Sequence, residues 1–171
     1  MFRFLRSPVW IAVPADAGAA DLCAMLHGRS FRRGWSANEF ESMLADPSVA
    51  ADLLVDRNDS RRAVLGFALS RKALDEAELC SIAVAPEVRG RGGGRVLLES
   101  HLARLANRGV RRVVLEVDRD NAPARRLYER FGFTEVGRRA GYYGASGGGT
   151  ALVLARQLGP PVLMDAPPVL P

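Results

Sequence analysis

A run of glycines and arginines between a strand-like stretch and a helix-like stretch is the feature that most constrains the fold of this chain. Residues 79–84 are largely apolar, and apolar residues recur at helical spacing over residues 96–106. At a helix start the first amide N–H groups are unpaired and lie at the positive end of the helix dipole. Glycines let such a backbone approach phosphate oxygens closely, and arginines add charge-assisted hydrogen bonds. The run therefore predicts an anion site suited to a pyrophosphate.

Two other glycine loops do not match this run. A Walker A loop ends in Gly-Lys-Ser/Thr, whereas Arg95 and Val96 follow Gly94 here. A dinucleotide-binding loop follows its strand directly and has a third glycine where this chain has Arg95. Nucleotide hydrolysis and dinucleotide binding are therefore disfavoured, which leaves a pyrophosphate site or an ordinary mobile loop.

The rest of the chain predicts a single α/β domain. Ser36 and Glu39 form a capping-box pattern that starts a helix, and Asp120-Asn121 can cap another. Residues 58–60 form a turn cluster between two apolar stretches, which predicts a β-hairpin. The expected strands cover residues 9–13, 53–57, 63–70, 79–84, 113–117, 134–143 and 150–158, and the expected helices cover residues 19–26, 36–44, 96–106 and 121–131. We expect the domain to span residues 1–158 and a disordered proline-rich tail to follow at 159–171.

Composition narrows the class of protein. With 171 residues, 48% of them hydrophobic, the chain fits one globular domain, and no apolar run approaches the roughly 20 residues of a membrane span. Cys23 and Cys80 lie far apart without a histidine-rich neighbourhood, so neither a disulfide framework nor a metal site is predicted, and a cytoplasmic location is the default. The net charge of +5 favours anionic partners, although Lys72 is the only lysine and the arginine excess fits coding bias almost as well.

Several motifs together resemble the GCN5-related N-acetyltransferases. The spacing Arg89-x-x-Gly92-x-Gly94, preceded by the strand at 79–84 and followed by Asn121, is similar to the acetyl-CoA site of that family. Within the family, the chain resembles protein N-terminal acetyltransferases, above all the bacterial ribosomal-protein-alanine group. The segments that carry this likeness are Leu115-Glu116-Val117, Leu127-Tyr128-Glu129-Arg130-Phe131-Gly132-Phe133 and Tyr142-Tyr143. The resemblance implies a mixed, mostly antiparallel sheet flanked by helices, with acetyl-CoA as co-substrate.

The resemblance also assigns residues to the cofactor. It implies that the strand at Ile82, Ala83 and Val84 parts from its neighbour, so that its amides hold the pantetheine arm and polarise the thioester carbonyl. It implies that Asn121 contacts the cofactor near its thiol, although capping preferences alone make Asn121 only a helix N-cap. It implies that the pyrophosphate is bound by one segment: Arg89, Gly90, Arg91, Gly92, Gly93, Gly94 and Arg95.

Two side chains are candidate catalytic groups. A free α-amino group has a pKa of about 7.7–8.0, against about 10.4 for lysine, so a modest base is enough to deprotonate it. Glu116 can serve as that base through a water. The leaving thiolate then needs a proton, and Tyr128, with an ordinary pKa of about 10, can donate it. The plain alternatives are a solvent-exposed edge residue for Glu116 and ordinary core packing for Tyr128.

Other titratable residues are weaker candidates, and some positions depart from the family pattern. Glu78 is the second candidate base, because other members of the family have a carboxylate on this strand. His27 and His101 have no partner motif, so we expect structural or solvated roles for both. Three departures bear on the sites: Gly90 and Gly93 stand where bulkier residues are usual, Gly141 stands in place of an asparagine, and the pair Arg138-Arg139 is shifted by one position.

The predicted function is an acetyl-CoA-dependent N-acetyltransferase that acts on a protein N-terminal α-amino group, with a ribosomal protein as candidate acceptor. The alternatives are a small-molecule amine acetyltransferase for polyamines or aminoglycosides, and a non-catalytic CoA-sensing or RNA-binding module. A nucleic-acid partner is not expected, because aromatic stacking platforms for bases are not evident. No membrane partner is expected either.

Overall fold

The computed structural model describes residues 8–59, 61, 63–140 and 149–159. Its strands are β1 (Trp10–Pro14), β2 (Val49–Asp56), β3 (Val64–Ala73), β4 (Glu76–Val84), β5 (Arg112–Asp118), β6 (Thr134–Ala140) and β7 (Thr150–Gln157). Its helices are α1 (Ala20–Gly28), α2 (Ala37–Ala45), α3 (Gly93–Asn107) and α4 (Ala122–Arg130), with short 3-10 turns at Ala17–Ala19 and Pro86–Val88. Residues 160–171 of the predicted tail lie outside this range, and the boundary at residue 158 stays a prediction.

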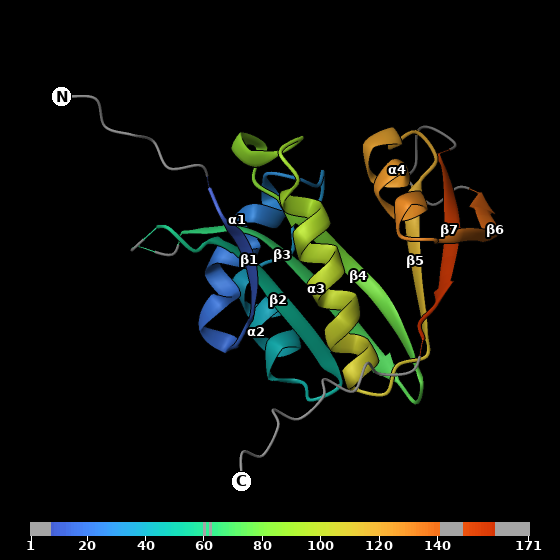
Figure 1. Ribbon diagram of the computed structural model, residues 1–171, viewed down its shortest axis with the longest axis horizontal. Helices are drawn as coiled ribbons and strands as arrows, with labels where there is room; N and C mark the ends of the chain where they lie inside the picture. Colours follow the sequence, from blue (N-terminus) through green and yellow to red (C-terminus); the bar gives the residue numbers. More distant parts are fainter. Residues whose placement is uncertain (1–7, 60, 62, 141–148, 160–171) are drawn as a thin grey trace, which may run out of the picture.

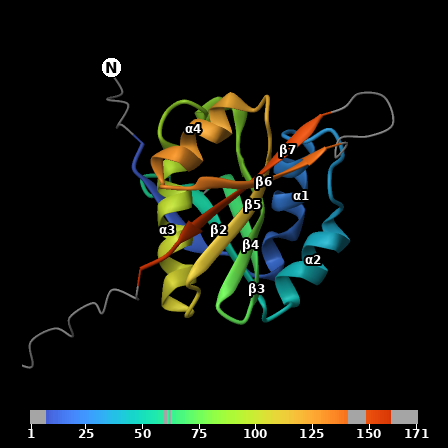
Figure 2. The same cartoon turned by 90° about the vertical axis from the view of Figure 1, so that its right-hand side faces the viewer.

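One sheet of seven strands forms the middle layer, in the order β1-β2-β3-β4-β5-β7-β6. Every neighbouring pair is antiparallel except β4 and β5. Figures 1 and 2 show α3 and α4 on one face of the sheet and α1 and α2 on the other. The predicted fold class, a mixed and mostly antiparallel sheet flanked by helices, is therefore confirmed.

The local signals placed most elements within a few residues. Ser36 caps α2, and Ser36 and Glu39 form the complete capping box. The largest shift at the start of a strand is in β2, which begins at Val49 rather than at residue 53. Ala50, Ala51 and Asp52 are buried within it. Alanine and aspartate are depleted in strands, so tertiary packing rather than local preference sets this start.

The two central strands, β4 and β5, separate soon after they meet. Their parallel pairing covers only Glu76–Glu78 of β4 against Arg112–Val114 of β5. Beyond it β4 continues to Val84 and β5 continues to Asp118. Figure 1 shows their ribbons diverging toward the end of the sheet where α3 begins. Within the part of the chain that the structure describes, residues 79–84 of β4 therefore pair with β3 on one side and have no strand partner on the other.

A buried polar network joins α3 to β2 and β3. Asp52 and His101 are fully buried, and His101 Nδ1 lies 2.7 Å from Asp52 Oδ2. Ser70 Oγ lies 2.7 Å from His101 Nε2, and Arg104 Nε donates to Asp52 Oδ1 at 2.7 Å. The predicted structural role of His101 is confirmed. Burying these groups is tolerable because each finds a hydrogen-bonding partner.

Replacing Asp52 with asparagine is expected to lower the free energy of unfolding by about 2–3 kcal/mol, because the amide has one acceptor oxygen for two donors. Urea denaturation measures this change, and the slope of the unfolding free energy against urea concentration (the m-value) should stay the same. The matched control is Glu41→Gln on the exposed surface of α2, which should shift stability by less than about 0.5 kcal/mol. Equal effects of the two substitutions would contradict a structural role for the network.

Candidate active site

The segment of residues 89–95, here called the glycine turn, leads into α3 with a backbone that requires glycine. Gly90 and Gly92 have φ angles of 70° and 90°, and Gly92 is the N-cap of α3. Residues other than glycine rarely adopt this left-handed backbone conformation. Among the described residues, the amides from Gly90 to Gly94 donate no hydrogen bond of ordinary geometry, and the first amide that does is Arg95 N, to Gly92 O at 3.1 Å. The turn therefore presents consecutive free donors at the positive end of a helix.

The glycine turn packs closely against the end of the sheet. A Cβ atom on Gly93 would lie 2.8 Å from Cδ2 of Leu54, which is fully buried. A Cβ atom on Gly94 would lie 3.6 Å from Leu127 Cδ2 and 3.7 Å from Val84 Cγ2. The start of α3 thus meets β2, β4 and α4 where β4 has left β5, and a larger residue at Gly93 would require Leu54 to move.

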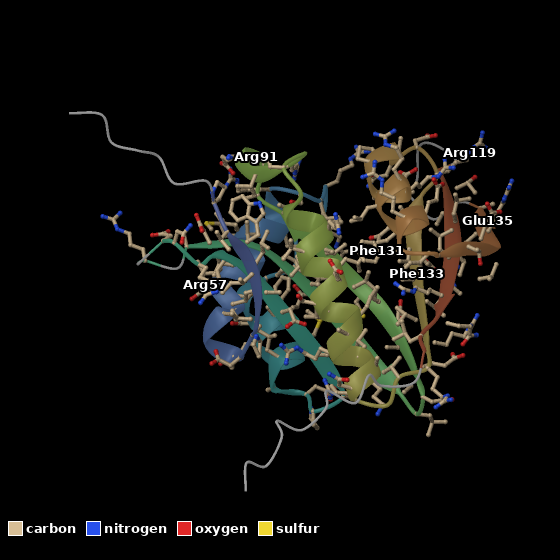
Figure 3. All side chains as sticks on the ribbon, in the orientation of Figure 1. Arg57, Arg91, Arg119, Phe131, Phe133 and Glu135 are labelled. Atoms are coloured by element: carbon tan, nitrogen blue, oxygen red, sulfur yellow. The ribbon has the colours of Figure 1, made fainter. Side chains whose placement is uncertain are left out.

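The three arginines of the turn are not equivalent. Arg89 Nε donates to Val84 O at 3.0 Å, and Arg89 Nη2 donates to Ser30 Oγ at 3.1 Å. Arg91, labelled in Figure 3, places its guanidinium 6.0 Å from the ring centre of Trp10. Arg95 is exposed and lies 4.0 Å from Glu99. Arg89 therefore uses donors to attach the turn to β4 and to the segment that follows α1, while its predicted contact with phosphate stays a prediction.

The residues predicted to hold the pantetheine arm lie on the separated part of β4. Ile82 and Ala83 pair with Ala68 and Phe67 of β3, and Val84 pairs with Gly66. The opposite edge of this stretch is no longer covered by β5. Backbone groups that point toward that edge are free to bind an extended ligand in the manner of an added strand.

Glu116 lies in the middle of β5 and is mostly buried. It pairs with Val153 of β7, and it lies beyond the three residues of β5 that pair with β4. Its side chain is 21% exposed, and Oε1 lies 3.2 Å from Arg139 Nη1. Oε2 is buried and has no hydrogen-bond partner among the described residues. The alternative of a solvent-exposed residue is therefore wrong, because most of the side chain is buried.

Tyr128 is buried in α4 with 6% of its surface exposed. Its ring packs edge-to-face on Phe133 at 5.7 Å between ring centres. Burial raises the pKa of the Tyr128 phenol above its ordinary value. No hydrogen bond to its hydroxyl occurs within the part of the chain that the structure describes. The side chain packs in the core, as the plain alternative proposed, and it also keeps an available phenol proton.

The two candidate catalytic groups approach from opposite faces of the sheet. Tyr128 belongs to the apolar cluster on the α3 and α4 face, together with Leu115 and Val117. Glu116 alternates with these two residues along β5, so its side chain leaves toward the α1 and α2 face. Glu116 and Tyr128 are thus not in direct contact, and each lies on one side of the region where β4 and β5 have parted.

The remaining predicted residues have simple structural surroundings. Asn121 caps α4, with Oδ1 accepting from Ala124 N at 3.2 Å, and its predicted contact with the cofactor stays a prediction. Glu78 is exposed and pairs with Val114, so it leaves the sheet on the same face as Glu116.

His27 is buried and stacks on Trp35. The Nδ1 atom of His27 accepts a hydrogen bond from Trp35 N at 3.1 Å, and burial lowers the pKa of this histidine. Gly141, Tyr142 and Tyr143 lie outside the described residues.

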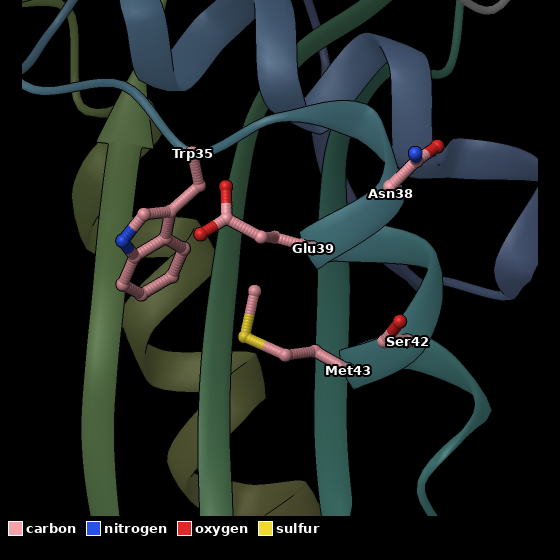
Figure 4. Close-up of a pocket in the computed structure, with 5 residues that line it drawn as sticks. All are labelled: Trp35, Asn38, Glu39, Ser42 and Met43. Atoms are coloured by element: carbon pink, nitrogen blue, oxygen red, sulfur yellow. The ribbon is translucent and has the colours of Figure 1, made fainter.

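Sequence reasoning missed two surface pockets. One, of about 370 Å³, lies beside α2, and Figure 4 shows Trp35, Glu39 and Met43 turned toward it. Trp35 and Met43 pack against the apolar cluster of the α1 and α2 face, the face toward which Glu116 points. The other, of about 620 Å³, lies between the start of β5, the end of β7 and the start of β6. Neither pocket includes the glycine turn, Glu116 or Tyr128. In the sequence, the only signal for the pocket beside α2 is Trp35, an aromatic residue directly before the capping box.

Within the described residues, no group of three or more His, Cys, Asp or Glu side chains is arranged to hold a metal ion. Among the same residues, no helix combines the length and apolar character that crossing a bilayer requires.

Comparison with known proteins gives consistent matches. The acetyltransferase (GNAT) family profile matches residues 22–133. A Haemophilus influenzae relative named [ribosomal protein bS18]-alanine N-acetyltransferase is 43% identical over 94 residues, which cover 54% of this chain and 64% of the relative. The match therefore spans slightly less than two thirds of that relative.

Two solved structures are also similar. The crystal structure of the Escherichia coli ribosomal-protein-S18-alanine N-acetyltransferase superposes with a TM-score of 0.77 at 30% identity, covering 87% of this chain and 94% of the other. Arabidopsis thaliana NAA60 in complex with acetyl-CoA has a TM-score of 0.77 at 18% identity, over 88% of this chain and 99% of the other, which is a likeness of fold alone.

Proposed function

The chain belongs to the acetyltransferase (GNAT) family. From that premise we propose that it is an N-acetyltransferase, which transfers the acetyl group of acetyl-CoA to the α-amino group of a protein N-terminus. A ribosomal protein is the proposed acceptor, from the printed names of the relatives, and a cytoplasmic location goes with that acceptor. The observation that carries the proposal is the separation of β4 from β5 beside a glycine turn with free amides.

The proposed cofactor position follows from the unpaired backbone groups. The pyrophosphate accepts from the amides of residues 90–94, with Arg91 and Arg95 adding positive charge nearby. The pantetheine arm lies along the free edge of β4 at Ile82, Ala83 and Val84. Asn121, at the start of α4, faces the thiol end. This arrangement puts the thioester where β4 and β5 have parted.

The proposed chemistry uses one proton acceptor and one proton donor. Glu116 takes a proton from the amine through a water, and its Oε2, which has no partner among the described residues, is not held in an ion pair. The amine nitrogen bonds to the carbonyl carbon, and the bond from that carbon to sulfur breaks. The thiolate takes the proton of Tyr128, whose pKa is raised by burial so that the phenol is protonated at neutral pH. Glu116 then releases its proton to water, and Tyr128 regains one.

The separation of the two groups supports a division between cofactor and acceptor. Tyr128 is on the α3 and α4 face, where the glycine turn would hold the cofactor. Glu116 points to the opposite face, from which an acceptor amine could approach. The thioester, between the parted strands, is open to both faces. An N-terminal amine suits this chemistry, because its ordinary pKa of about 7.7–8.0 leaves part of it neutral near neutral pH.

An acetyl-transfer assay tests the acceptor. Purified protein and acetyl-CoA are incubated with three kinds of acceptor: a peptide with a free N-terminal alanine, the same peptide with a blocked N-terminus and an internal lysine, and spermidine or an aminoglycoside. We expect thiol release and a single added acetyl group with the free peptide, and rates at least about 10-fold lower with the others, because lysine-like amines are largely protonated. Faster reaction with polyamine or aminoglycoside would favour the small-molecule alternative. Salt-sensitive RNA binding without any acetyl transfer would favour a non-catalytic module.

A further inference from the structure

We propose that Trp10, on the first strand of the sheet, is a positioning residue for the cofactor: it holds the glycine turn in the conformation that accepts the pyrophosphate. The inference rests on the proposed function and adds a residue outside the motifs that identify the cofactor site. Trp10 and Arg91 are 81 residues apart in sequence.

Two contacts join Trp10 to the turn. The indole Nε1 donates to the backbone oxygen of Arg91 at 3.3 Å. The guanidinium of Arg91 lies over the same ring at 6.0 Å, within the range of a cation–π interaction. One side chain therefore holds Arg91 by its main chain and by its side chain. In Figure 3, Arg91 is labelled at the turn that precedes α3, next to β1.

The backbone of Trp10 is held in the sheet. Trp10 pairs with Asp56 of β2, and its half-buried ring packs against both apolar clusters of the domain. The indole is therefore a rigid support, whereas the turn that it contacts is rich in glycine. A hydrogen bond from a fixed donor selects among the many conformations that glycines allow.

The glycine turn has few attachments of its own. Its amides at residues 90–94 make no ordinary hydrogen bond among the described residues, and two of its residues have left-handed backbones. Arg89 attaches the beginning of the turn to Val84 O and Ser30 Oγ. Trp10 attaches the next stretch, between Gly90 and Gly92. Without Trp10, this stretch becomes ordered only when pyrophosphate binds. The entropic cost of that ordering makes the binding free energy less favourable.

Binding of CoA, measured by isothermal titration calorimetry, tests the proposal directly. Trp10→Phe keeps an aromatic ring but removes the N–H donor, and we expect it to weaken CoA binding about 3- to 10-fold. Trp10→Leu also removes the cation–π contact, and we expect a further loss of about 2- to 5-fold. In the acetyl-transfer assay, KM for acetyl-CoA should rise in parallel, while kcat and KM for the acceptor peptide stay within about 2-fold, because the turn is remote from the thioester.

Ile11→Val is the matched control, because Ile11 is the next residue on β1 and pairs with Val55 rather than contacting the turn. It should lower stability by an amount similar to Trp10→Phe without changing CoA affinity. Unchanged affinity in Trp10→Phe, or an equal loss in Ile11→Val, would overturn the role of Trp10 and leave the proposed function intact. Failure of the unaltered protein to bind CoA would overturn both. If Trp10→Leu does not fold, Trp10→Phe alone decides.

Discussion

Replacing Glu116 with glutamine is expected to lower the turnover of acetyl transfer by about 10²–10⁴-fold, the usual contribution of a general base. Glutamine keeps the size of the side chain but cannot accept the amine proton. The site makes this substitution informative, because Oε1 faces Arg139 at 3.2 Å while Oε2 is buried without a partner among the described residues. CoA affinity, measured by calorimetry, should stay within about 2-fold, because Glu116 points away from the proposed cofactor face.

Glu78→Gln is the matched control for this prediction. Glu78 leaves the sheet on the same face as Glu116, but it is exposed and lies in the segment of β4 that still pairs with β5. We expect its loss to change turnover by less than about 3-fold, as for a surface carboxylate that takes no part in proton transfer. The reverse pattern, with Glu78→Gln inactive and Glu116→Gln active, would move the general base to Glu78.

Replacing Tyr128 with phenylalanine is expected to lower turnover by about 10²–10⁴-fold, because the leaving thiolate then lacks its proton donor. Phenylalanine fills the same space against Phe133, and the lost hydroxyl has no partner among the described residues. Thermal unfolding should therefore change little, by less than about 1 kcal/mol, which separates a chemical role from a packing role. Near-normal turnover would leave Tyr128 as a core residue only.

The pH dependence gives a second check on Tyr128. Burial raises its pKa, so the phenol keeps its proton to higher pH than an ordinary tyrosine does. A group that acts as an acid loses activity only as the pH rises through its pKa, so Tyr128 should cause no alkaline loss of turnover below about pH 10. An alkaline limb below that pH which disappears in Tyr128→Phe would contradict this prediction.

Much of the fold was predictable because its signals are local. The capping box at Ser36, the cap at Asn121 and the glycines before α3 each depend on a few neighbouring residues, and the structure has an element boundary at each. The order of strands and helices follows from these signals together with apolar periodicity. The family resemblance supplied the sheet type, which periodicity alone does not determine.

Features that depend on distant residues could not be predicted from local patterns. Asp52 looks like a surface residue in sequence, yet His101 and Arg104 of α3 make it a fully buried acceptor. The separation of β4 from β5 depends on pairing that stops after three residues of each strand. The contact between Trp10 and Arg91 joins residues that are 81 positions apart in sequence. In each case the deciding partner lies on another element.

The candidate site was predicted at the level of residues but not of geometry. Sequence indicated Glu116 and Tyr128 as a pair, and the structure adds that they lie on opposite faces of the sheet, because strand alternation and helix placement fix each side chain separately. Sequence treated Arg89, Arg91 and Arg95 alike, and the structure separates them by their partners. Their roles in binding and catalysis stay predictions.

A crystal structure with CoA joined covalently to the N-terminal alanine of an acceptor peptide is the most direct test. We predict the pyrophosphate on the amides of the glycine turn, the pantetheine arm along Ile82, Ala83 and Val84, and the peptide on the α1 and α2 face with its nitrogen within reach of Glu116 through one water. A complex in which the pyrophosphate lies away from the turn, or in which peptide and nucleotide share one face of the sheet, would contradict this arrangement.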